Sequence, residues 1–132
     1  MSALILYQYT GCSTCRKAIR WLAETGIEVE RRSITEAPPS AELLARLHRT
    51  SGLAIGRLFN SSGESYRAGN FKARRASMSD AECYEAFAAD GKLIRRPILI
   101  SASLLSDKEA GPETPAVALI GFREAEWRAA LL

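Results

Sequence analysis

The sequence predicts an α/β fold in which a mixed sheet of about four strands carries an inserted helical block. An apolar run that leads through a glycine turn into an amphipathic segment, with another strand-like segment behind it, is typical of a parallel strand-helix-strand unit. Two short apolar runs near the other end resemble a hairpin. The expected elements are strands at 3–9, 27–34, 97–100 and 116–120, helices at 13–25 and 124–132, and a helical block at about 38–91.

The first helix is expected to begin next to Cys12 and to end at Gly26. Ala18, Ile19 and Leu22 recur at helical spacing, and Gly26 is suited to a C-terminal cap. The strand that follows alternates polar and apolar residues imperfectly, which is typical of an edge strand.

Turn and cap signals mark the helical block. Pro38-Pro39 interrupts regular structure, and Ser40 is suited to cap a helix at 41–50 that Gly52 would end. Ser79 followed by Glu82 is a capping-box pattern and predicts a helix that ends at Asp90-Gly91. The Arg- and Lys-rich segment 66–77 between them has no clear period.

The last third of the chain is expected to complete the sheet. Pro97 must open its strand because proline lacks the N–H that a sheet interior requires. Residues 101–115 contain several breakers and are interpreted as a loop, and the strand at 116–120 is expected to pair antiparallel with the preceding strand.

Length and composition limit the classes of function. A chain of 132 residues supports a single domain, here 1–132, and 47% apolar with 25% charged residues is typical of globular proteins. No stretch approaches the roughly 20 apolar residues of a membrane span, and no signal peptide is recognised. The net charge of +3 is not concentrated in one run, so neither membrane nor direct nucleic-acid binding is expected. Three cysteines, an odd number, favour reduced thiols and a cytoplasmic location.

Cys12 and Cys15 are the candidate reactive groups. The N-terminus of a helix favours a thiolate, so Cys12 is interpreted as a nucleophile and Cys15 as the thiol that resolves its adduct. The alternatives are an inert Cys12 and a Cys15 that only packs in the core. A zinc site is disfavoured because Cys83 and His48 do not provide a second ligand pair at zinc spacing.

Arg95 and Arg96 precede Pro97 directly. A guanidinium beside a thiol can bind an oxyanion and lower the pKa of the thiol. If the two arginines lie on a strand, they point to opposite faces. Only one of them is then expected to face Cys12, and the other is expected to be solvated.

Several motifs together resemble one family. The Cys-x-x-Cys at the first helix, the proline that opens the third strand and the element order resemble the thioredoxin fold. The motifs that narrow the resemblance are Gly11-Cys12-Ser13-Thr14-Cys15-Arg16-Lys17-Ala18, Pro38-Pro39, Leu58-Phe59-Asn60, Gly91-Lys92-Leu93-Ile94-Arg95-Arg96-Pro97-Ile98 and Gly121-Phe122. They resemble the arsenate reductase-like family, which also contains the Spx-type regulators, and they cover nearly the whole chain.

The resemblance implies a thiol-dependent reductase that converts arsenate to arsenite. Cys12 would attack arsenate, and Cys15 would resolve the adduct. Arg96 would stabilise the anion, which leaves Arg95 as the solvated arginine, and a cis bond would precede Pro97. Similar reductases carry arginines at Asn60 and next to a proline at Gly121-Phe122, and usually a serine at Cys15. The residues expected to contact substrate are Gly11, Ser13, Thr14, Arg16, Asn60 and Pro97.

The implied partners are an arsenate substrate and an external thiol system, either glutathione with glutaredoxin or thioredoxin, with no bound cofactor or metal. Two alternatives remain open. One is an Spx-type redox sensor that binds RNA polymerase, because those regulators also have cysteine at the position of Cys15. The other is a general disulfide or glutathione-linked reductase.

Overall fold

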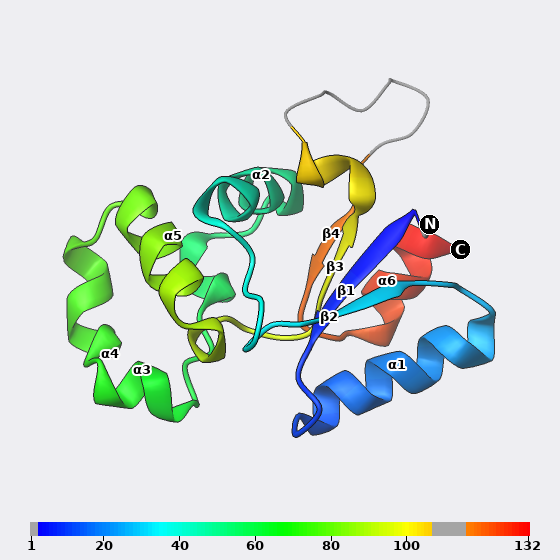
Figure 1. The fold of residues 1–132 in the computed structure, drawn as a ribbon, viewed down its shortest axis with the longest axis horizontal. Coiled ribbons are helices and arrows are strands. Elements are labelled where there is room, and N and C mark those ends of the chain that lie inside the picture. The colour runs from blue at the N-terminus through cyan, green and yellow to red at the C-terminus, as the bar shows by residue number, and fades with distance from the viewer. Residues whose placement is uncertain (1–2, 107–115) are drawn as a thin grey trace.

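The computed structural model describes residues 3–106 and 116–132. Its centre is a four-stranded mixed sheet in the order β2-β1-β3-β4 (Figure 1). β1 (Leu4–Gln8) pairs in parallel with β2 (Glu30–Ser33) and antiparallel with β3 (Ile98–Ser101), which pairs antiparallel with β4 (Ala118–Ile120). The α/β class, the mixed sheet and the C-terminal hairpin are confirmed.

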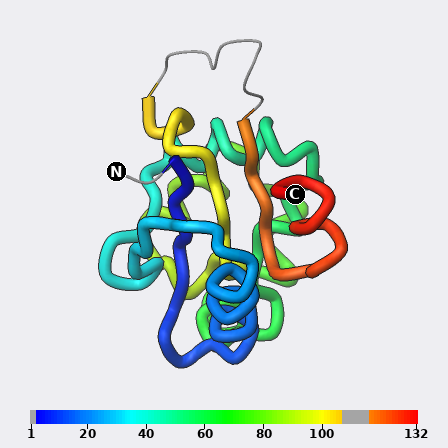
Figure 2. The backbone as a smooth tube through the Cα atoms, turned by 90° about the vertical axis from the view of Figure 1, so that its right-hand side faces the viewer, coloured from blue at the N-terminus to red at the C-terminus, as the bar shows by residue number. Residues whose placement is uncertain are grey.

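Helices cover both faces of the sheet. The helices are α1 (Ser13–Thr25), α2 (Ala41–Ser51), α3 (Glu64–Ala68), α4 (Phe71–Arg74), α5 (Asp80–Ala89) and α6 (Glu124–Leu131), with single 3-10 turns at 55–58, 75–77, 91–93 and 102–105. Figures 1 and 2 show α1 and α6 together on one side of the sheet and the helices from α2 to α5 on the other.

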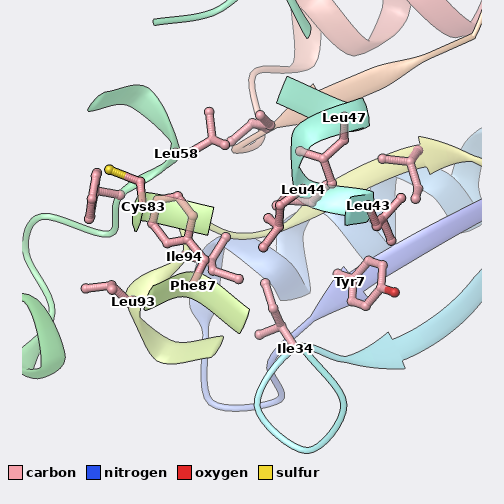
Figure 3. Packing of buried hydrophobic residues seen from close by; sticks show 14 of the residues in the cluster. Tyr7, Ile34, Leu43, Leu44, Leu47, Leu58, Cys83, Phe87, Leu93 and Ile94 are labelled. Atoms are coloured by element: carbon pink, nitrogen blue, oxygen red, sulfur yellow. The ribbon is translucent and has the colours of Figure 1, made fainter. Parts of the chain in front are cut away.

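The alternation of side chains along the strands separates two apolar clusters. Ile5, Tyr7 and Ile98 point to the larger cluster, which includes Leu44 of α2 and Phe87 of α5. Figure 3 shows this packing, which includes the buried side chain of Cys83, so Cys83 is a core residue.

The opposite face of the sheet carries the smaller cluster. Leu6 and Leu99 pack there with Trp21 of α1 and Trp127 of α6. This cluster holds α1 against the sheet. It therefore also fixes the position of Cys12 and of the loop between β1 and α1, which we call the Cys12 loop.

The predicted caps are confirmed. Gly26 and Gly52 end their helices with φ of 75° and 70°, a conformation that glycine adopts at no steric cost. The Ser40 side chain accepts a hydrogen bond from the Leu43 N–H at the start of α2. Ser79 and Glu82 form a complete capping box at the start of α5.

Some predicted boundaries were wrong. The strand expected at 27–34 is limited to 30–33, because the N–H of Ile27 closes the turn after α1 by donating to the Leu22 carbonyl, and Ile27 and Val29 pack on the smaller cluster. Ser101 belongs to β3, and residues 102–105 form a 3-10 turn where a loop was expected. The rest of that expected loop, 107–115, lies outside the described residues.

The segment at 66–77 forms the short helices α3 and α4 and one 3-10 turn. Two of its arginines pack on aromatic rings: the Arg74 guanidinium lies 4.6 Å from the centroid of the Phe71 ring, and that of Arg75 lies 5.9 Å from the centroid of the Phe59 ring. Within 3–106 and 116–132, no helix is long and apolar enough to cross a membrane.

Candidate functional site

Cys12 is the N-cap residue of α1, at the end of the loop that follows β1. Its Sγ accepts a hydrogen bond from the backbone N–H of Cys15 at 3.3 Å, so the thiol satisfies one of the free donors of the first helical turn. Gly11 is required just before it, because a Cβ there would lie 2.9 Å from the Tyr9 ring.

The environment of Cys12 favours its thiolate. Partial burial acts to raise the pKa of Cys12, but hydrogen bonds from the side chain and backbone of Cys15 and the hydrogen bond and charge of Arg96 outweigh it. The net result is a pKa of Cys12 below its usual 9.0. A thiol with a lowered pKa at a half-buried position can act as a nucleophile.

Cys15 has the opposite character. Its side chain is fully buried, and burial, the hydrogen bond with Cys12 and the charge of Cys12 raise the pKa of Cys15 to about 12. Cys15 is therefore held as a protonated thiol, whereas the surroundings of Cys12 favour its thiolate. The two cysteines are both free thiols in the structure.

Arg96 reaches Cys12 from the segment before β3. Its guanidinium lies 5.0 Å from the centroid of the Tyr9 ring, and its Nη1 donates to the Lys92 carbonyl at 3.4 Å. The Arg96–Pro97 peptide bond is cis, as the resemblance implied. Arg96 is thus held next to the thiol that it helps to ionise.

Backbone hydrogen bonds bring three distant segments to the Cys12 loop. Phe59 and Ile94 form an isolated antiparallel bridge, which places residues 57–60 beside residues 93–96. The N–H of Arg95 donates to the Leu58 carbonyl at 2.7 Å, and the N–H of Gly121 donates to the Pro97 carbonyl at 2.8 Å.

These segments line a cavity of about 500 Å³ beside Cys12, formed by residues 11–14, 57, 60–63, 95–96 and 120–123. Of the expected substrate contacts, the cavity lining includes Gly11, Ser13, Thr14 and Asn60. The Asn60 amide is engaged with a neighbouring segment, since its Nδ2 donates to the Lys92 carbonyl at 3.3 Å.

Arg16 and Pro97 do not line this cavity. Arg16 is exposed and donates to the Thr10 carbonyl at 3.0 Å, and it lines a separate hollow with Arg20 and Arg31. Pro97 is buried beneath the segment that carries Arg96. The predicted contact of these two residues with substrate therefore has no support in the geometry.

The prediction that Arg95 is solvated was wrong. Arg95 lines the same cavity as Arg96 and is half-buried. The alternation of a strand does not apply to these two residues because β3 begins only at Ile98. The Arg95 side chain lies beside Gly121, whose φ of 74° favours glycine.

Arg57 and Arg123 are cavity residues that the sequence did not reveal. They lie on unrelated segments, and no local spacing connects them with the cysteine pair. Among the described residues, no three His, Cys, Asp or Glu side chains gather in a way that could hold a metal ion.

The model of the ArsC family matches residues 7–130. The chain belongs to the ArsC family. The protein of Bacillus subtilis named uncharacterized protein YusI is 46% identical over 96 residues, which cover 73% of this chain and 81% of that protein. The structure of a possible arsenate reductase from Streptococcus mutans UA159 matches with a TM-score of 0.79 and 33% identity, covering 93% of both chains.

The agreement with a solved ArsC-like structure over almost the whole chain confirms the predicted thioredoxin-like fold. A more distant relative is the global transcriptional regulator Spx of Lactiplantibacillus plantarum, which is 24% identical over 102 residues, 77% of this chain and 76% of that protein. The ArsC family and its reductase-like members indicate a thiol oxidoreductase.

The positive charge of this ArsC-family site comes from other positions than those at which the resemblance implied arginines. Asn60 and Gly121-Phe122 occupy positions where arginines were expected, yet Arg57 and Arg123 line the cavity from nearby positions in the same two segments. With Arg95 and Arg96, the cavity is lined by four arginines.

Proposed function

We propose that this protein is a thiol-dependent reductase that converts arsenate to arsenite, with Cys12 as nucleophile and Cys15 as resolving thiol. The observation that carries the proposal is the position of Cys12. Its Sγ lies at the start of α1, accepts the Cys15 N–H and is stabilised as a thiolate by Arg96 in an arginine-lined cavity.

The first step forms a bond between Cys12 Sγ and the arsenic of arsenate. An arsenic–oxygen bond breaks, and the oxygen leaves as water after protonation. Arg96 holds the oxyanion through charge-assisted hydrogen bonds while the bond forms. Arsenic is still As(V) at this point.

The second step transfers two electrons. The Cys15 thiol loses its proton and attacks Cys12 Sγ, and the sulfur–arsenic bond breaks with its electron pair on arsenic, which is released as arsenite, As(III). The two thiols are oxidised to a Cys12–Cys15 disulfide. An external thiol system, thioredoxin or glutathione with glutaredoxin, would reduce this disulfide in the cytoplasm.

The test is arsenate-dependent oxidation of NADPH by the purified protein coupled to either system. Activity is expected in the native protein, and Cys12→Ser is expected to abolish it. Cys15→Ser should leave the first adduct on Cys12, which mass spectrometry detects. Cys83→Ala is the matched thiol control and should keep activity, because Cys83 lies in the core away from the cavity. Arsenite production that survives Cys12→Ser would exclude the mechanism.

The second candidate is an Spx-type redox sensor that binds RNA polymerase. The presence of Cys15 and the 24% identity to a regulator named Spx favour it. The test is capture of RNA polymerase by the oxidised protein. Capture that depends on the Cys12–Cys15 disulfide would support this function, and its absence in both redox states would exclude it.

A further inference from the structure

The cavity beside Cys12 is larger than arsenate requires. An oxyanion of five heavy atoms displaces roughly two or three water molecules at about 30 Å³ each. The cavity measures about 500 Å³, which lies within the range of sites for organic ligands. Most of its volume is therefore available for something other than the anion next to Cys12.

The arginines of the cavity fall into two groups. Arg96 is the one whose charge lowers the pKa of Cys12. Arg57, Arg95 and Arg123 form the second group: all three line the cavity, and the pKa of Arg95 is lowered by burial and further by the positive charges of Arg57 and Arg123. We name them the arginine triad.

Few acidic residues in the part of the chain that the structure describes lie near the arginine triad to neutralise its positive charge. No aspartate or glutamate is among the described residues that line the cavity. Arg123 pairs with Glu126 at 3.7 Å, but both side chains are more than half exposed, and such pairs contribute little. The Nε of Arg95 is buried and has no hydrogen-bond partner within the described chain. Buried donors of this kind are normally satisfied by a ligand or by water.

An apolar wall completes this part of the cavity. Ile120 and Phe122 line it next to Gly121, and the Phe122 ring is fixed at 4.9 Å from the Trp127 ring, centroid to centroid. A wall of this kind suits the carbon skeleton of an organic molecule whose negative groups reach the arginines.

We propose that Arg57, Arg95 and Arg123 form an anion subsite for an organic disulfide that carries carboxylate groups, which places its sulfur atoms at Cys12. The proposal rests on the proposed role of Cys12 as nucleophile and adds a second substrate class to it. A guanidinium binds a carboxylate through paired hydrogen bonds, so the subsite selects anionic disulfides over neutral ones.

The reaction balances without a further reactant. The Cys12 thiolate attacks one sulfur of the disulfide, the sulfur–sulfur bond breaks, and the first thiolate leaves. The Cys15 thiol then loses its proton and attacks Cys12 Sγ, which releases the second thiolate. One disulfide is reduced to two thiols while Cys12 and Cys15 are oxidised to a disulfide.

The experiment compares two chromogenic disulfides under pseudo-first-order conditions. 5,5′-Dithiobis(2-nitrobenzoate) carries two carboxylates, and 4,4′-dithiodipyridine is neutral. The proteins are the native chain, Arg57→Gln, Arg123→Gln and the double variant, with Cys12→Ser as the blank. Each arginine removed is expected to lower the rate with the anionic reagent roughly two- to fivefold and to leave the rate with the neutral reagent unchanged.

Arg49→Gln is the matched control, because it removes the same charge from an exposed position of α2 outside the cavity. An equal loss in Arg49→Gln would show a general charge effect and overturn the subsite. An equal loss with both reagents in the Arg57 and Arg123 variants would overturn it as well. If the native protein reacts with neither reagent faster than the Cys12→Ser blank, the proposed role of Cys12 as nucleophile is contradicted instead.

Discussion

The backbone N–H of Cys15 donates a hydrogen bond to Cys12 Sγ at 3.3 Å, and the two thiols have opposite pKa shifts. Burial raises the pKa of Cys15, and the side-chain hydrogen bond with Cys12 and the charge of Cys12 raise it further, so a thiolate at Cys12 helps to keep Cys15 protonated. The proposed nucleophile and the proposed resolving thiol therefore differ in acidity because of their positions at the start of α1.

Arg96→Gln is expected to raise the pKa of Cys12. Arg96 lowers that pKa through a hydrogen bond and its charge, so without it the thiolate forms only at higher pH. The rate of alkylation of Cys12 by iodoacetamide, measured against pH, should shift to higher pH and be slower near neutrality. Arg20→Gln, an exposed arginine of α1, should leave the profile in place. An unchanged profile in Arg96→Gln would contradict the assigned role.

Cys15 is expected to become more acidic once Cys12 has reacted. Its pKa of about 12 is due to burial and also to the hydrogen bond and charge of Cys12, and an adduct on Cys12 removes the charge. After reaction of Cys12 with methyl methanethiosulfonate, acid quenching and mass spectrometry give the rate of Cys12–Cys15 disulfide formation. This rate should rise with pH and level off below pH 12. A rate that still rises steeply through pH 12 would disagree with the coupling.

Gly91→Ala is expected to destabilise the fold by roughly 3 kcal/mol or more. A Cβ at Gly91 would lie 1.7 Å from the carbonyl oxygen of Ile34, so the backbone of one segment must move. The matched control is Gly52→Ala, where the space is open and only the left-handed φ of 70° costs about 1 kcal/mol. Urea denaturation measures both, and similar losses in the two variants would be evidence against the close approach.

Trp127→Phe is expected to cost about 2 kcal/mol, because it removes a buried hydrogen bond and part of a fully buried ring. The Nε1 of Trp127 donates to the Gly121 carbonyl at 2.9 Å and so ties α6 to the segment that carries Arg123. Urea denaturation measures the loss of stability. In the same variant, the rate of reaction with 5,5′-dithiobis(2-nitrobenzoate) should fall more than the rate with 4,4′-dithiodipyridine. A stability equal to that of the native protein would contradict the role of this bond.

Local sequence patterns were sufficient to predict much of the fold. Caps such as Gly26 and Ser40 act within a few residues, so their signals can be read without knowledge of the tertiary structure. Ile27 and Val29 are the exception, because their apolar character looks like a strand but is used to pack against α1. Only the tertiary structure decides between the two uses.

The candidate site was predictable at Cys12, Cys15 and Arg96, where motif and geometry coincide. The arginine triad was not predictable, because its members are separated by more than 25 residues in the sequence and are brought to one cavity by tertiary contacts such as the Phe59–Ile94 bridge and the Gly121–Pro97 hydrogen bond. Arg95 was assigned to solvent for a different reason: the alternation rule was applied to a segment that is not a strand.

Trp21 and Trp127 have a consequence for the study of this protein in solution. They are its only tryptophans, and both rings contact Phe122, at 6.0 and 4.9 Å between centroids. All indole fluorescence thus originates from one cluster that adjoins the wall of the cavity. A ligand that moves Phe122 would change this emission, so occupancy of the cavity can be followed optically in the unlabelled native protein.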